Sequence, residues 1–132
     1  MIETTALLLG LPFDFAAKDI INPATGVAYP DLTVFDGRDL FCSCKDSLDA
    51  TTAVKTITDT DTARLQFTTT KIGVKLFDHA ESKALDEGKT YYLDLWLKDE
   101  NDEFFPANFG TAAAPEYIVK FTTQKPVSTN PV

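Results

Sequence analysis

The stretch "TYYLDLWLKDENDEFF", residues 90–105, constrains the fold more than any other part of the sequence. Its side chains alternate between two faces, with Tyr91, Leu93, Leu95 and Leu97 on one and Tyr92, Asp94, Trp96 and Lys98 on the other. A period of two with one apolar face is typical of a half-buried antiparallel strand. The acidic "DENDE" then predicts a turn, and "FF" begins the returning strand. The sequence therefore predicts a β-hairpin, with its register set by the alternation.

Four other segments predict strands by the same alternation. The residues expected to face inward are Leu40, Cys42 and Cys44 in 39–46, Ala63, Leu65 and Phe67 in 63–69, Ile72, Val74 and Leu76 in 72–77, and Tyr117, Val119 and Phe121 in 116–123. Residues 10–31 are rich in Gly, Pro, Asn and Asp and predict turns around short extended pieces. The polar stretch 78–88 lacks an apolar stripe, so it predicts one helical turn or a loop.

These short strands predict an all-β domain, in which the abundant Thr, Phe and Val residues favour pleated, half-buried surfaces. A chain of 132 residues can bury most of one core without further support. We expect a two-layer antiparallel β-sandwich over residues 13–123, with a β-barrel as the topological alternative. Residues 1–12 are expected to form an N-terminal docking segment or edge strand, and residues 124–132 an extended C-terminal tail.

The charge of the chain limits its partners. Twenty acidic and twelve basic residues give a formal charge of −8, which repels phosphate backbones, so we expect no nucleic acid as a partner. The apolar run at 6–13 is too short to span a bilayer and has no basic residue before it. We therefore expect synthesis in a cytoplasm and no contact with a membrane.

Both cysteines, Cys42 and Cys44, lie in "FCSCKD" with one residue between them. Structural zinc needs four ligands, and the chain adds only one histidine, His79. A redox pair has the spacing C-x-x-C at a helix N-terminus, and residues i and i+2 of a strand lie about 6.6 Å apart, near the upper limit for a disulfide. We interpret the pair as small hydrophobic residues of the core, with a disulfide between subunits as the alternative.

No other motif predicts catalysis. His79 has no nucleophile motif to join, and the acidic stretches 58–62 and 99–103 do not match a calcium-binding loop, so both are interpreted as solvated turns. Glycine-rich phosphate loops and dinucleotide fingerprints are also lacking in the sequence. We therefore expect a binding or structural protein, with no enzymatic activity and no cofactor.

The stretch "LDEGKTYYLDLWLKD" resembles the tyrosine corner of immunoglobulin-like sandwiches, with Leu85, Gly88 and Tyr91 in a Leu-x-x-Gly-x-x-Tyr arrangement. In that motif the tyrosine hydroxyl bonds to the backbone of the corner, and the ring covers the end of the core. Leu93 stands where antibody-type domains have the second cysteine, so the resemblance does not extend to their inter-sheet disulfide.

Together with "DLTVFDGRDLFCSCKD", the Thr-rich middle and "YIVKFTT", residues 30–123 resemble small immunoglobulin-like structural proteins of tailed bacteriophages. The resemblance implies a virion component of the head, neck, tail or baseplate, acting in capsid decoration or fibre attachment, that docks onto sibling chains and other virion proteins. It also implies a homo-oligomeric or high-copy assembly, which we expect to be held through strand edges and the two terminal segments.

The alternative function is a carbohydrate- or receptor-binding β-sandwich. Three aromatic residues, Tyr92, Trp96 and Phe104, are the candidate stacking platforms for such a ligand. Burial of Trp96 between the layers would count against this alternative.

Overall fold

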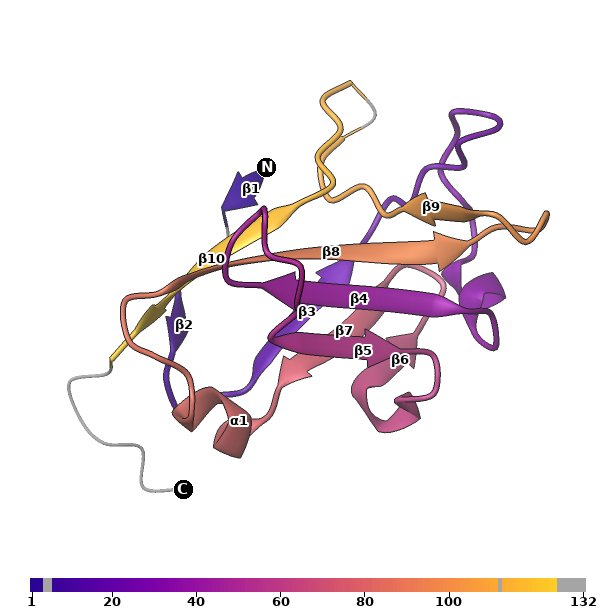
Figure 1. Ribbon diagram of the computed structural model, residues 1–132. Coiled ribbons are helices and arrows are strands. Elements are labelled where there is room, and N and C mark those ends of the chain that lie inside the picture. Colours follow the sequence, from indigo (N-terminus) through magenta and orange to yellow (C-terminus); the bar gives the residue numbers. More distant parts are fainter. Residues whose placement is uncertain (4–5, 112, 126–132) are drawn as a thin grey trace.

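The computed structural model describes residues 1–3, 6–111 and 113–125, and its two β-sheets pack face to face (Figure 1). In the large sheet the strand order is β1-β10-β8-β4-β5, and β2 and β9 pair with β10 and β8. Its strands are β1 (Ile2–Glu3), β2 (Leu7–Leu8), β4 (Leu40–Lys45), β5 (Lys55–Thr58), β8 (Thr90–Lys98), β9 (Phe104–Pro106) and β10 (Val119–Gln124). The small sheet has the order β3-β7-β6, with β3 (Phe13–Ala17), β7 (Ile72–Phe77) and β6 (Leu65–Phe67).

The all-β prediction is confirmed, and so is the hairpin over 90–105. The long strand β8 lies at the centre of the large sheet and pairs antiparallel with β4, β9 and β10. In this register Cys42 lies opposite Leu95, and Phe41 lies opposite Trp96. The central position of β8 follows from its length and from its alternation, because one face can fill the core along the whole strand.

The prediction of a purely antiparallel sandwich is wrong at one edge of the large sheet. Both β1 and β2 pair with β10 in parallel, so the large sheet is mixed. The first and last strands are not joined by a hairpin, and hence no tight turn forces them to run in opposite directions. Residues 1–12 thus contain edge strands, whereas the expected tail beyond Lys125 lies outside the described residues.

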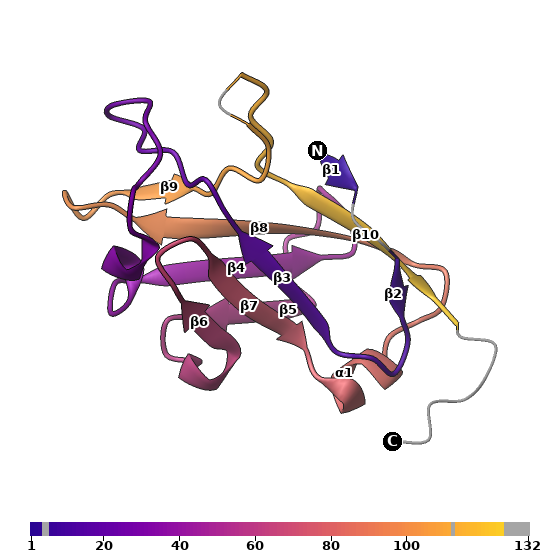
Figure 2. The ribbon, with the colours of Figure 1, turned by 180° about the vertical axis from the view of Figure 1, so that it is seen from behind.

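On the side of β8 away from β4, the neighbouring strand is interrupted. Both β9 and β10 pair with β8, and between them the described residues 108–111 and 113–118 lie outside the strands (Figure 2). The side-chain amide of Asn108 holds the base of this excursion, because its oxygen accepts hydrogen bonds from the N–H groups of Gly110 and Glu116, both at 2.9 Å. The two pairings involve residues 90–93 and 96–98 of β8, so Asp94 lies between them.

Two predicted inward residues are exposed, and two others, Leu65 and Phe67, are only partly buried. Tyr117 is exposed because β10 begins only at Val119, after the excursion, so the alternation does not extend back to it. Ala63 is exposed in the 3-10 helix η2 (Thr62–Arg64), which precedes the shorter strand β6. The strand β3 was not located by the sequence, although it falls in the segment expected to contain short extended pieces.

The core lies between the inner faces of the two sheets. Phe13 of the small sheet stacks on Phe121 of the large sheet, with ring centroids 4.4 Å apart, and Tyr91 stacks on the same ring at 5.5 Å. The predicted inward sets of β4, β7 and β8 are buried, which confirms those alternations. Within the described residues, no buried side-chain nitrogen or oxygen lacks a hydrogen-bond partner.

The segment after β7 forms the short helix α1 (His79–Lys83) at the rim of the two layers. Asp78 and Glu81 form a capping box, each accepting a hydrogen bond from the other's backbone N–H. The Glu81 carboxylate also forms ion pairs with Lys55 of β5 and with Arg64 of η2, the latter at 2.7 Å. One helical turn therefore connects the large sheet to the segment that enters β6. A 3-10 helix, η1 (Leu32–Phe35), precedes β4.

Candidate functional site

The outer face of the large sheet, formed by β4, β8 and β9, is the candidate site. Because side chains alternate along each strand, the residues between the core residues point away from the small sheet. The outward residues are Phe41, Ser43 and Lys45 on β4, Tyr92, Asp94, Trp96 and Lys98 on β8, and Phe104 and Pro106 on β9. We call this surface the outer face.

Three large aromatic side chains are exposed on the outer face. Phe41 is 44 % exposed, Trp96 36 % and Phe104 49 %. Phe41 and Trp96 are cross-strand neighbours, and the three rings line a hollow of about 400 Å³. Aromatic residues at this degree of exposure are enriched at binding surfaces, where they provide large contact areas at a small cost in conformational entropy.

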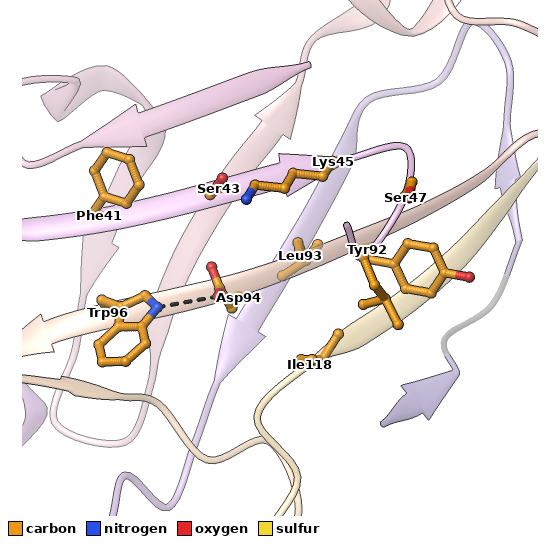
Figure 3. A pocket seen from close by; sticks show the side chains of 10 residues that line it. Phe41, Ser43, Lys45, Ser47, Tyr92, Leu93, Asp94, Trp96 and Ile118 are labelled. Atoms are coloured by element: carbon orange, nitrogen blue, oxygen red, sulfur yellow. Dashed lines mark hydrogen bonds between the residues drawn. The ribbon is translucent and has the colours of Figure 1, made fainter. Parts of the chain in front are cut away.

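A second depression, of about 270 Å³, lies beside Trp96 over β4 and β8, with Ile118 at its edge (Figure 3). Asp94 lies in it, and its carboxylate accepts a hydrogen bond from the indole N–H of Trp96 at 3.2 Å. The side chains of Ser43, Lys45 and Tyr92 also line it, each of them half-buried. The depression thus combines an aromatic wall with hydrogen-bond donors and acceptors.

At the other end of the outer face, Lys98 lies between the Phe104 ring and the Asp39 carboxylate. Its ammonium lies 5.2 Å from the centre of the Phe104 ring and 2.9 Å from a carboxylate oxygen of Asp39. The hydrogen bond to Asp39 raises the pKa of Lys98 above its ordinary value, so this cation is present at neutral pH. Such cation–π contacts at exposed sites are weak but orient the ring.

The stacking candidates predicted from the sequence come together only in part. All three lie on the outer face, but Trp96 and Phe104 line the hollow with Phe41, whereas Tyr92 lines the second depression and is half-buried. The alternation predicts that Phe41 faces outward, but Phe41 was not among the predicted stacking residues. Its role depends on the pairing of β4 with β8, and only the register brings it beside Trp96.

Both cysteines lie on the inner face of β4 as free thiols, and neither is exposed to solvent. Burial raises the pKa of Cys44 to about 12 and that of Cys42 still further. A disulfide to another chain would require the two layers to separate at β4. The interpretation of the pair as core residues agrees with this placement, and the intersubunit disulfide stays a prediction that the burial disfavours.

The tyrosine-corner segment is held by a different hydroxyl from the one expected. Tyr91 is buried and stacks on Phe121. Within the described residues, the hydroxyl that bonds to the backbone of this corner is that of Thr123, which donates to the carbonyl of Asp86 at 2.5 Å and accepts from the N–H of Lys89 at 3.0 Å. The local sequence gave no signal for this bond, because Thr123 lies 37 residues from Asp86.

The remaining polar candidates have structural partners. A ring nitrogen of His79 lies 2.9 Å from the carbonyl oxygen of Gly10. In the acidic turns, Asp99 accepts from the N–H groups of Asn101 and Glu103, and Asp61 accepts from that of Thr58. In the described part of the chain, no group of three or more His, Cys, Asp or Glu side chains could hold a metal ion.

The fold and the outer face together define a class: an all-β domain whose large sheet has one side in the core and an aromatic side in solvent. No protein-family model matches this sequence, and comparison with curated proteins and with solved structures finds no match either. Among the described residues, none of the helices has the length and apolar character needed to cross a membrane.

Proposed function

We propose that this chain is an immunoglobulin-like docking domain of a tailed-bacteriophage virion. The strand order supports the immunoglobulin-like part of the proposal. In such domains one sheet contains strands B, E and D, and the other contains G, F, C and C′. The orders β3-β7-β6 and β10-β8-β4-β5 correspond to these two sets, strand for strand. The placement of β1 and β2 beside β10, rather than beside β3, is the departure from the constant-type pattern.

Exposed leucines on the N-terminal edge carry the docking part of the proposal. Leu7 is buried, whereas Leu8 and Leu11 are 37 % and 43 % exposed. This segment is held to the end of β10 by the β2 pairing and by a hydrogen bond from the N–H of Leu9 to the carbonyl of Gln124 at 3.0 Å. An edge strand that also exposes apolar side chains is a template for another chain.

A sibling chain is the occupant that we assign to this edge. Strand β10 ends at Gln124 beside this edge, and the proposal therefore includes both terminal segments, 1–12 and 124–132. Repeated use of one edge in a symmetric assembly allows weak contacts to add through multivalency. This arrangement fits the homo-oligomeric or high-copy role that the resemblance implies.

Sedimentation velocity of the purified chain tests the proposal. We expect concentration-dependent self-association that is weakened at least about tenfold by the double change Leu8→Lys and Leu11→Lys, since two charges would enter the contact. Val27→Lys is the matched control, because Val27 is 65 % exposed in a loop distant in sequence from this edge. Monomeric behaviour of the wild-type chain at all concentrations would contradict edge docking. The virion assignment is tested by mass spectrometry of purified particles, where absence of the chain would contradict it.

A further inference from the structure

We propose that the depression beside Trp96 on the outer face binds a saccharide. This site does not depend on the N-terminal edge, because it lies over β4 and β8 on the flat side of the sheet, with Ile118 at its rim. A domain that docks through its edge leaves this face free. The two proposals can therefore fail separately.

The aromatic half of the site fits the apolar side of a sugar ring. A pyranose presents C–H groups on one side of its ring, and these pack against the face of an aromatic side chain. Trp96 and Phe41 supply two such rings on neighbouring strands, and Phe104 extends the aromatic surface toward β9. Ligand sites are typically lined by aromatic side chains with a few polar groups, which is the composition found here.

The polar half of the site has both acceptors and donors, as hydroxyl groups require. The Asp94 carboxylate uses one oxygen for Trp96 and retains further acceptor capacity. Lys45 carries three N–H donors, and within the described residues it forms no ion pair. Ser43 adds a hydroxyl that can donate or accept. A sugar hydroxyl both donates and accepts, so it can satisfy each of these groups.

The same polar groups disfavour other occupants. An apolar protein anchor seated in the depression would take Asp94 and Lys45 out of water without giving them partners, which is costly. A nucleic acid would meet the Asp94 carboxylate and a chain of net charge −8. A neutral, polyhydroxylated ligand avoids both penalties.

The dimensions of the site suit a short oligosaccharide. The depression of about 270 Å³ is at the small end of ligand sites, comparable with one or two sugar rings. The hollow of about 400 Å³ shares Phe41 and Trp96 with it. A chain of sugar rings can thus cross from Asp94 over Trp96 to Phe104.

Binding can be measured on an array that carries bacterial surface polysaccharides together with cellohexaose, chitohexaose and maltohexaose. Positive probes are then titrated in solution and followed by the fluorescence of Trp96, the only tryptophan in the chain. We expect a Kd between about 10 µM and 1 mM, because a shallow site recovers little of the cost of association. Trp96→Ala should weaken binding at least about tenfold, as read by calorimetry, because it removes the main stacking surface.

Isosteric changes keep the test independent of folding. Asp94→Asn and Lys45→Gln should each weaken binding about three- to tenfold, since each removes one charged hydrogen-bonding group. Asp14→Asn and Lys75→Gln are matched controls, because these two residues are exposed cross-strand neighbours on the small sheet. Binding of the wild type that both control variants retain, and that the site variants lose, supports the proposal.

Three results would overturn it. The first is the lack of binding to every glycan on the array. The second is binding that Trp96→Ala and Asp94→Asn leave unchanged. The third is loss of self-association in Trp96→Ala without any bound glycan, which would mean that a second copy covers the outer face. Edge docking would survive the first two results, because Leu8 and Leu11 are tested by sedimentation alone.

Discussion

The inner and outer faces of the large sheet are formed by the same strands and have opposite chemistry. Along β4, Cys42 and Cys44 are fully buried, whereas Phe41, the residue before Cys42, faces outward and is 44 % exposed. Along β8, Leu95 lies in the core and Trp96, the next residue, lies in solvent. A step of one residue exchanges core for surface in a strand. Stability and ligand binding can thus be carried by neighbouring residues and changed separately.

The largest expected difference between the faces is in thiol reactivity. Burial raises the pKa of both cysteine thiols, so at pH 8 their reaction with a disulfide reagent should be at least about 100-fold slower in the native protein than in urea. Ser43→Cys places a thiol on the outer face between them, and this thiol should react rapidly. Stopped-flow or manual absorbance assays measure both rates.

Fast native reaction of the wild-type chain would contradict the placement of Cys42 and Cys44 in the core. A denaturing gel without reductant adds a second reading. A reductant-sensitive dimer would favour the intersubunit disulfide, and a single monomer band would favour the buried pair.

Truncation of adjacent residues tests the two faces for stability. Leu95→Ala should lower the free energy of unfolding by about 2–5 kcal/mol, because it opens a cavity in a fully buried position. Trp96→Ala should cost less than about 1 kcal/mol, because its ring already contacts water. Urea denaturation of both variants measures the difference. Equal losses in the free energy of unfolding would mean that Trp96 is packed like a core residue.

The rim of the layers contributes stability that depends on charge. Burial raises the pKa of Glu81, but hydrogen bonds from Lys55, the Asp78 backbone and Arg64 outweigh it and lower this pKa to about 2 from 4.5. Glu81→Gln should therefore lower the free energy of unfolding at pH 7 by about 1–3 kcal/mol, reduced by the partial exposure of the carboxylate. Glu87→Gln, a change at an exposed residue of the following turn, is the control.

The pH dependence has a definite sign. The pKa of Glu81 is lower in the folded chain than in the unfolded one, so its stabilisation is complete above about pH 4.5 and is lost as the pH falls toward 2. The difference between wild type and Glu81→Gln in urea denaturation should shrink over that range. A constant difference would mean that the ion pairs are not its source.

The smallest expected effect concerns the end of the inner face near the corner. Thr123→Val should cost about 1–2 kcal/mol, because it leaves the partly buried N–H of Lys89 and carbonyl of Asp86 without their hydroxyl partner. Tyr91→Phe should cost less, since it keeps the ring stacked on Phe121. Thermal or urea unfolding ranks the two variants. The reverse ranking would support a tyrosine corner of the usual kind.

The sequence predicted the parts of the fold that depend on local alternation. The inward sets of β4, β7 and β8 follow from a period of two, and a buried face leaves little freedom in register. The capped turn at α1 is also local, since Asp78 and Glu81 are three residues apart. Parallel pairing of the first strands with β10 could not be predicted, because it joins residues more than 100 positions apart without a connecting turn.

The candidate site was predictable in composition but not in assembly. Alternation placed Trp96 and Phe41 on outward faces of separate strands, and only the β4–β8 register makes them neighbours. The depression beside Asp94 also combines residues distant in sequence, because side chains of β4 and β8 line it together with Ile118. The error at Tyr117 has a different origin, because the excursion between β9 and β10 delays the start of β10. Long-range pairing and irregular backbone are the information that a periodic pattern lacks.

Fluorescence quenching of Trp96 tests most directly that the outer face is open and binds a ligand. The chain has a single tryptophan, so acrylamide quenching reports on this residue alone. We expect ready quenching in the native protein and reduced quenching when a saccharide identified on the array is added. A native tryptophan that acrylamide cannot reach, or quenching that no saccharide changes, would contradict it.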